Sequence, residues 1–374
     1  MTVSTSRVFG LDVVRAVAIL FVVLAHGLPL LGPHVPVYDW RLGHLGSIGA
    51  EMFFVLSGFL IGGILMRLEP EFTGARTLLG FLIRRWFRTL PNYFLFLALN
   101  IPFMIYVVHG NPPWSEFLPR FATFTQSFVQ RPLPFFLESW TLAIEEWFYL
   151  LTPLGFLVFR LLLRSFNRGV LVTAALLLVI PPLLRWRASS SGDWASDIRM
   201  VTTMRLDALI YGIVAAWLNH RYRERFRQVR WIALIAGIAL SYWNYQMLFR
   251  LNLDTSVFAK TWLLSLIPFG FALLLPWAAN APAFGGQWFV KPVQRVALWS
   301  YALYLVNIPV SYYVTYRMGG WHERSTLDGW LATALYWAVA IGVSAAVYRW
   351  FERPMMNLRE RFTISRSVAR ASSR

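Results

Sequence analysis

The chain has 374 residues, of which 57% are hydrophobic, 17% aromatic and only 14% charged. This composition is typical of a polytopic membrane protein and excludes a mainly soluble one. The net charge of +17 does not indicate nucleic-acid binding, because the basic residues are dispersed over many short segments. Since the sequence contains no cysteine, disulfides, thiolate metal sites and a cysteine acyl-enzyme are excluded.

Ten apolar stretches are each long enough to approach the roughly 20 residues that a membrane-spanning helix needs. They lie at 11–31, 46–66, 90–108, 140–163, 169–186, 203–219, 231–249, 257–279, 296–316 and 329–350. Of the basic residues, 23 fall on the side of the termini and 11 on the opposite side. These stretches predict an all-α polytopic protein of the inner (cytoplasmic) membrane that contacts membrane lipids. The positive-inside rule places both termini in the cytoplasm.

The first stretch, GLDVVRAVAILFVVLAHG at 10–27, carries three ionisable residues. Arg15 and His26 are eleven positions apart, so on a helix they differ by about 20° in direction and about 16 Å in height. Asp12, three residues before Arg15, can pair with it. Arg15 alone is explained equally well as a lipid anchor and His26 as an interfacial residue. Their shared face favours a polar groove whose cytoplasmic mouth is marked by Asp12 and Arg15.

Further ionisable residues fall in predicted spans, where each carboxylate costs about 2–3 kcal/mol to insert. Glu145 and Glu146 stand in SWTLAIEEWFYLL, Arg205 and Asp207 open the sixth span, and Glu51 enters the second. Adjacent glutamates point about 100° apart on a helix, so Glu145 and Glu146 cannot both face the same partner in the same way. We expect structural ion pairs between helices to explain some of these buried ionisable residues, and a polar cavity to explain the others.

A cluster of arginines stands in FLIRRWFRTLPNY at 81–93, which we expect to be a cytoplasmic loop before the third span. Arg85 and Arg88, next to Arg84, have the i,i+3 spacing that places two guanidinium groups on one side of a helix. Such a pair suits a phosphate group. A cluster that only sets membrane orientation explains it equally well.

Taken together, these segments resemble the integral-membrane acyltransferase-3 family over nearly the whole chain. The resemblance rests on the Arg15/His26 pair after GLD, the Arg85/Arg88 pair, FFVLSGFLIG at 53–62, SWTLAIEEWFY at 139–149, RLDALIYG at 205–212, SYALYLVNIP at 300–309 and FERP at 351–354. It implies transfer of an acyl group, usually acetyl, from acetyl-CoA or another acyl-CoA to a hydroxyl of a carbohydrate or glycolipid. The CoA is a substrate, and no permanently bound cofactor or metal is expected.

The resemblance also assigns roles to individual residues. It makes His26 and Arg15 essential for activity and connects Arg85 and Arg88 with the acyl-CoA. We expect Glu145 and Glu146 to belong to the catalytic site, one as the structural partner of an arginine and the other orienting His26 or a substrate hydroxyl. Arg84 and Arg15 are expected to help hold the donor.

The ninth predicted span departs from the family pattern, since position 307 is asparagine where many relatives have histidine. Asparagine forms hydrogen bonds but does not accept a proton near neutral pH. We therefore expect Asn307 and Tyr304 either to bind the acceptor or to have a structural role. The same two roles are expected for the other polar residues of the spans, which are Asp12, Glu51, Arg205 and Asp207.

The expected organisation is one acyltransferase domain at 1–350 and a basic cytoplasmic tail at 351–374. We expect no soluble esterase-like domain after the last span, so that a second transfer step would need a separate periplasmic or polysaccharide-assembly protein. Two other classes stay open: a transporter or glycan flippase with His26, Glu145 and Glu146 as a proton relay, and a receptor or scaffold that has lost its chemistry.

Overall fold

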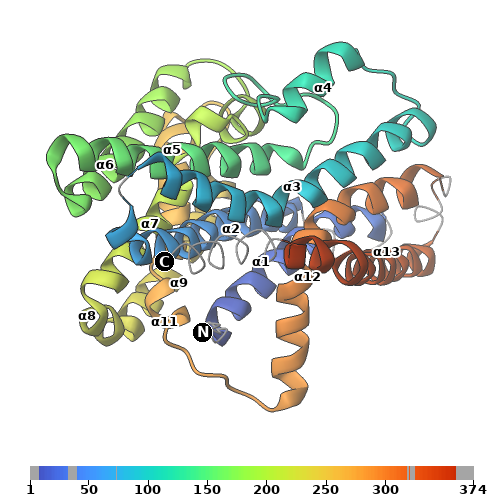
Figure 1. Cartoon of the computed structure of the whole chain (residues 1–374). Helices are drawn as coiled ribbons and strands as arrows, with labels where there is room; N and C mark the ends of the chain where they lie inside the picture. Colours follow the sequence, from blue (N-terminus) through green and yellow to red (C-terminus); the bar gives the residue numbers. More distant parts are fainter. Residues whose placement is uncertain (1–7, 33–39, 73, 318–319, 321–324, 359–374) are drawn as a thin grey trace. The chain divides into compact units, whose positions relative to one another are not determined.

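The computed structural model describes residues 8–32, 40–72, 74–317, 320 and 325–358, which form helices and turns and contain no β-strand (Figure 1). The chain divides into two compact units. The first unit comprises Met1–His26, Asp39–Thr73 and Pro113–Ala297, and the second comprises Gly27–Tyr38, Gly74–Pro112 and Leu298–Arg374.

The first unit is built mainly of long apolar helices that pack side by side. Its α-helices are α1 (Phe9–Gly27, up to His26), α2 (Trp40–Arg67), α4 (Trp114–Ala122), α5 (Ser139–Leu163), α6 (Phe166–Ala188), α7 (Asp207–Arg221), α8 (Arg223–Gln228), α9 (Arg230–Arg250), α10 (Leu264–Ala272), α11 (Leu275–Ala278) and the start of α12 (Gln287–Tyr312). Short 3-10 and π-helical turns join them: η2 (Glu69–Glu71), η3 (Trp194–Arg199), η4 (Thr202–Met204) and η5 (Ala259–Leu263).

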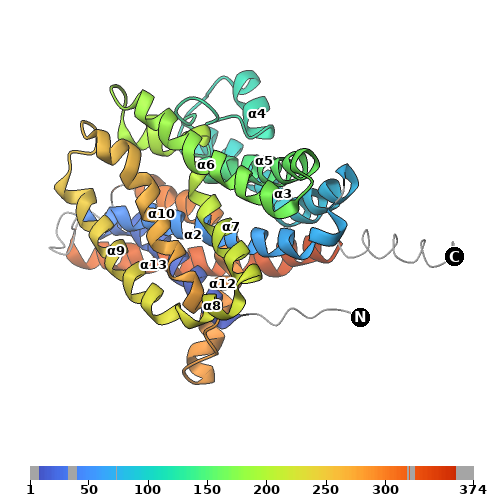
Figure 2. The ribbon, with the colours of Figure 1, turned by 90° about the vertical axis from the view of Figure 1, so that its left-hand side faces the viewer.

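The core of this unit forms where α2 packs against α7 and α10. Two glycines allow the close approach of α2 and α7. A β-carbon at Gly58 would overlap the carbonyl oxygen of Leu209, and one at Gly212 would overlap that of Val55. Figure 2 shows α7, α9 and α10 side by side, and Figure 1 shows α5 beside α6.

The second unit contains η1 (Leu28–Leu31), α3 (Ala75–Tyr106), the part of α12 from Leu298, η6 (Tyr313–Arg317), α13 (Thr326–Val347) and η8 (Tyr348–Glu352). α13 packs on η1 at Gly329, where a β-carbon would overlap the carbonyl oxygen of Leu31. α3 contacts η8.

Eight helices of the described residues are long and apolar enough to cross a membrane, which confirms a polytopic helical protein. They span Phe9–Leu31, Leu42–Arg67, Ala75–Tyr106, Ser139–Leu163, Phe166–Ala188, Arg230–Arg250, Ala259–Ala278 and Thr326–Leu358. Two predicted spans are not among them. α7 has only 15 residues, and the tyrosines, tryptophans and Asn307 of α12 lower its mean hydropathy.

The expected boundary at residue 350 falls inside a helical segment, because the last candidate span continues to Leu358. The rest of the predicted tail, 359–374, lies outside the described residues.

Candidate active site

α1 carries the first predicted polar residues as one uninterrupted helix from Phe9 to Gly27. The eleven-residue spacing of Arg15 and His26 therefore keeps both on nearly one face, about 16 Å apart along the axis. Both side chains are half-buried, while Asp12 is buried. Ala25, next to His26, packs against Gly46 of α2, where a β-carbon would lie 3.0 Å from the Ala25 β-carbon.

Glu145 of α5 joins two of the sequence segments on which the resemblance rests. The Ser57 hydroxyl donates to its Oε1 at 2.8 Å, and the Tyr149 hydroxyl donates to its Oε2 at 2.8 Å. Both carboxylate oxygens are thus held in place by neutral donors, which stabilise a charged carboxylate without neutralising it. Glu146 is half-buried on the adjacent face of α5.

Glu51, Arg205 and Asp207 lie in a cluster of buried ion pairs. Arg205 donates to Glu51 Oε2 at 2.5 Å and to the carbonyl oxygen of Leu264. Asp207 accepts two hydrogen bonds from Arg185, at 2.8 and 2.7 Å, and one from the Ser265 hydroxyl. These contacts connect α2, α6, α7 and α10, so all three predicted residues have structural roles in this cluster.

Arg185 and Arg199 belong to the same cluster but were not expected there. Arg185 stands near the end of the fifth predicted span and counts among the 11 basic residues opposite the termini, yet its side chain is fully buried in the last turn of α6. Arg199 Nε lies 4.0 Å from Glu51 Oε1, and its guanidinium carbon lies 4.7 Å from the ring centre of Trp140. The one available signal was the excess of carboxylates in the predicted spans, which required buried cations.

The arginines at 84–88 lie within α3, so the expected loop at 81–93 is wrong. Arginine and leucine are good helix formers and extend the helix back to Ala75, and Pro91 does not end it. Arg84 and Arg85 are half-buried and Arg88 is exposed. The i,i+3 geometry predicted for Arg85 and Arg88 is therefore realised on a regular helix.

The turn that follows these arginines is fixed by two other sequence segments of the second unit. The Tyr301 hydroxyl donates to the carbonyl oxygen of Thr89 at 2.9 Å, and the amide of Asn92 donates to Glu352 Oε2 at 3.0 Å in a buried contact. Tyr301 belongs to SYALYLVNIP and Glu352 to FERP. The second unit thus holds the Arg85/Arg88 helix by contacts from α12 and η8.

Asn307 is fully buried in α12. Its amide nitrogen donates to the carbonyl oxygens of Leu303 and Tyr304, at 3.0 and 2.6 Å, within its own helix. These bonds favour the structural role among those expected for position 307. The Tyr304 side chain is half-buried.

Glu138 is a buried acid that the sequence did not single out. It directly precedes α5, and burial raises the pKa of its carboxyl from the ordinary value of 4.5 to about 8. At neutral pH this side chain is therefore largely neutral. Its position in an aperiodic connection gave no sign of burial.

The family model described as "Acyltransferase domain" matches residues 8–349. The chain belongs to this acyltransferase family. The expected resemblance is thereby confirmed. The matched range includes the Arg15/His26 pair, the Arg85/Arg88 pair and every family-like segment quoted above except FERP, which lies at 351–354.

Relatives of this acyltransferase are named as O-acetyltransferases. The chain is 28% identical over 225 residues to a "Putative O-acetyltransferase" of Staphylococcus aureus (strain COL), covering 56% of this chain and 34% of the relative. It is 28% identical over 224 residues to the "Putative peptidoglycan O-acetyltransferase YrhL" of Bacillus subtilis (strain 168), covering 55% and 32%.

The "Peptidoglycan O-acetyltransferase OatA" of Listeria monocytogenes is 32% identical over 174 residues, covering 42% of this chain and 25% of the relative. The matched segments thus span about a third or less of these relatives. No solved structure matches the chain significantly.

Within the acyltransferase, each unit contributes its own set of family residues. The first unit holds Arg15 and His26 on α1, the hydrogen-bonded Glu145 on α5 and the buried ion pairs of α2, α6 and α7. The second unit holds Arg85 and Arg88 on α3, with Tyr301 and Glu352 fixing the turn behind them.

Proposed function

We propose that this acyltransferase is an O-acetyltransferase of the cytoplasmic membrane that moves an acetyl group from acetyl-CoA to a carbohydrate hydroxyl. The acceptor would be a surface polysaccharide, an exopolysaccharide or a glycolipid. The observation that carries the proposal is the family match over residues 8–349, with Arg15 and His26 on one continuous helix. The relatives named for peptidoglycan O-acetylation support a glycan acceptor.

In the proposed reaction, His26 acts as the base, because imidazole accepts and returns protons near neutral pH. It takes the proton from the acceptor hydroxyl, and the oxygen attacks the thioester carbonyl. The carbon–sulfur bond then breaks, and the imidazolium returns the proton to the CoA thiolate. A variant route places the acetyl group on His26 first and then transfers it to the hydroxyl.

Arg85 and Arg88, with Arg84 on the same helix, are proposed to bind the phosphates of the donor. Guanidinium groups donate two parallel hydrogen bonds to phosphate oxygens, and the exposed Arg88 is accessible for this role. Glu145 is proposed to orient His26 or the acceptor, because its two bound donors fix its position.

We further propose ten membrane crossings with both termini cytoplasmic. α7, about 22 Å long, is the shortest of them. Residues 193–195 and 199–200 before α7 and residues 253–254 after α9 line one pocket. The chain between them must therefore travel away and return, which supports a crossing by α7 and a return by α9.

The proposal is tested with the purified chain in lipid nanodiscs and with mass spectrometry of the envelope glycans of the host. We expect His26→Ala to abolish O-acetylation of the glycan while acetyl-CoA still binds. Arg85→Ala and Arg88→Ala should each raise the Kd for acetyl-CoA about tenfold, the loss expected for a charge-assisted hydrogen bond. Arg76→Ala, an exposed arginine of the same helix, is the matched control. Unchanged glycan acetylation in His26→Ala would refute the enzyme.

A further inference from the structure

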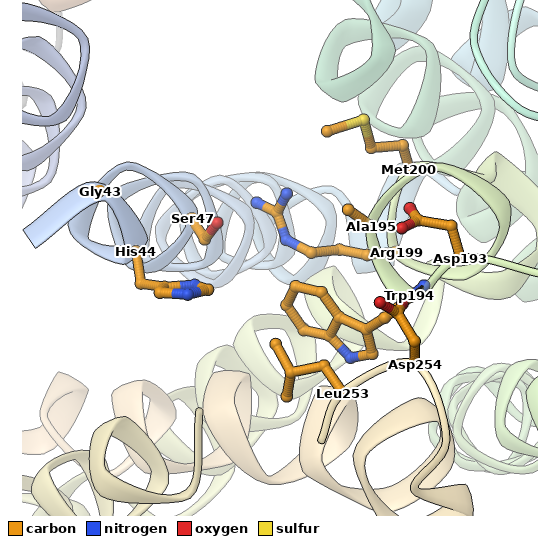
Figure 3. A pocket seen from close by; sticks show the side chains of 10 residues that line it. All are labelled: Gly43, His44, Ser47, Asp193, Trp194, Ala195, Arg199, Met200, Leu253 and Asp254. Atoms are coloured by element: carbon orange, nitrogen blue, oxygen red, sulfur yellow. Dashed lines mark hydrogen bonds between the residues drawn. The ribbon is translucent and has the colours of Figure 1, made fainter. Parts of the chain in front are cut away.

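A pocket of about 360 Å³ opens in the first unit between the start of α2 and the segments around η3 and residue 253 (Figure 3). Its lining residues are Gly43, His44, Ser47, Asp193, Trp194, Ala195, Arg199, Met200, Leu253 and Asp254. The volume falls at the lower end of the range for small-molecule sites, about 300–1,000 Å³. It suits a single sugar residue better than an oligosaccharide.

The pocket combines hydrogen-bonding groups with apolar surface. Asp193 and Asp254 are exposed, and the hydrogen bonds from Ser196 and from the Trp194 backbone nitrogen reach their Oδ1 atoms. Their Oδ2 atoms are therefore available as acceptors, and the Ser47 hydroxyl serves as donor or acceptor. Leu253, Met200 and Trp194 add apolar lining. Figure 3 shows the Trp194 and Arg199 side chains directed from η3 toward the α2 side of the pocket.

This lining favours a neutral polyhydroxylated ligand. Two carboxylates beside one guanidinium oppose an anion, and the several polar groups oppose a purely apolar molecule. Among the described residues, no group of three His, Asp or Glu is arranged to hold a metal ion. The hydroxyl groups of a sugar, in contrast, donate to carboxylates, while the carbon–hydrogen face of its ring packs on apolar side chains.

The segment that carries the pocket is held rigidly. The backbone nitrogen of Trp194 donates to Asp254 Oδ1 at 2.7 Å, and its indole nitrogen donates to the carbonyl oxygen of Ala259. The buried Lys260 ammonium donates to the carbonyl oxygens of Ser189, Ser191 and Gly192. A site that is fixed before binding loses less conformational entropy when its ligand arrives.

The pocket lies at the level of α1 that carries His26. Gly46, which packs against Ala25, stands in α2 between the lining residues His44 and Ser47. We infer that this pocket binds one sugar residue of the acceptor and delivers it to the end of α1 where His26 lies. That this sugar belongs to the acceptor rests on the proposed acetyl transfer, whereas the binding of a sugar in the pocket does not.

The test uses variants that alter the pocket without disturbing its support. Gly43 lines the pocket, and a β-carbon there would have no heavy atom within 4 Å, so Gly43→Phe adds a large side chain at the pocket where its first atom has space. Gly342 of α13 is equally open, and Gly342→Phe is the matched control. Asp193→Asn combined with Asp254→Asn keeps both Oδ1 acceptors and replaces each Oδ2 by a donor.

Binding is measured by saturation-transfer NMR on nanodiscs, with methyl β-D-glucopyranoside and methyl N-acetyl-β-D-glucosaminide as probes. We expect saturation transfer to at least one probe with the wild type and with Gly342→Phe. With Gly43→Phe and with the double asparagine variant, the affinity for that probe should fall about tenfold or more. The Kd for acetyl-CoA should stay unchanged in all of them. Folding is checked by the melting temperature.

The outcomes separate this inference from the proposed function. Sugar binding that Gly43→Phe abolishes supports the pocket even if the wild type transfers no acetyl group, a result that would reject only the enzymatic proposal. Wild-type sugar binding and glycan acetylation in a folded Gly43→Phe protein would overturn the pocket and leave the enzyme intact. Absence of saturation transfer from the folded wild type to both probes would also overturn it.

Discussion

Arg185 and Asp207 form a doubly hydrogen-bonded ion pair in which both side chains are completely buried. The pair joins the last turn of α6 to the first turn of α7, and the Ser265 hydroxyl donates to the same carboxylate from α10. Arg185 also donates to the carbonyl oxygens of Met204 and Thr261. With its guanidinium and its carboxylate satisfied in this way, the pair sets the positions of three helices.

Removing one partner of this pair should destabilise the protein severely. Asp207→Asn leaves the Arg185 charge buried without its counter-ion, and breaking a buried pair in this way costs about 3–5 kcal/mol. We expect a large fall in the melting temperature in detergent. The control is Arg131→Ala, which breaks an ion pair of similar geometry with Asp197 in which Arg131 is largely exposed. That change should cost less than about 1 kcal/mol. Equal losses in the two variants would contradict the argument.

The same residues show how far sequence reasoning reaches. Apolar length predicted most helices, and the cost of buried carboxylates indicated that Glu51 and Asp207 need polar surroundings. The partners Arg185 and Arg199 were not predictable. An arginine at the end of a helix has the same sequence surroundings whether its side chain faces solvent or a neighbouring helix. Which of the two occurs is decided by tertiary packing.

Helix boundaries and irregular segments were also difficult to predict from the sequence. The arginines at 84–88 suggested a loop by their charge, although arginine favours helices and α3 includes them. The lining of the pocket comes from turns around Trp194 and Asp254, which have no periodic pattern. Sequence order does not reveal that these turns meet the start of α2.

Glu138 should make stability depend on pH. Its pKa is raised to about 8 by burial, so the folded state holds its proton more tightly than the unfolded state, whose pKa is near 4.5. The contribution is complete below pH 4.5 and is lost as the pH rises to about 8, by at most about 5 kcal/mol. Unfolding of the wild type and Glu138→Gln between pH 5 and 9 measures it. The variant should lose less stability over this range, and parallel curves for the two proteins would reject the assignment.

Glu145 is predicted to depend on its two donors for its role in acetyl transfer. Tyr149→Phe and Ser57→Ala each remove one hydrogen bond and should lower kcat by about three- to tenfold, while Glu145→Gln should lower it by about 100-fold. The fall should appear in kcat, with the Kd for acetyl-CoA unchanged in both donor variants. Tyr242→Phe, at an exposed position of α9, serves as the control and should change neither. A lower melting temperature with an unchanged kcat would show that the donors are only structural.

Glu352 is predicted to act on acetyl-CoA binding through the helix that carries Arg85 and Arg88. It accepts a buried hydrogen bond from Asn92, one turn after Arg88 on α3, and thereby holds that turn against η8. Glu352→Ala should raise the Kd for acetyl-CoA about three- to tenfold, because the two guanidinium groups lose their fixed orientation. Glu352→Gln retains an acceptor oxygen for Asn92 and should restore most of the affinity. Isothermal titration of acetyl-CoA into nanodisc-embedded protein measures both. If the alanine and glutamine variants bound alike, at wild-type melting temperature, the contact would have no part in positioning the arginines.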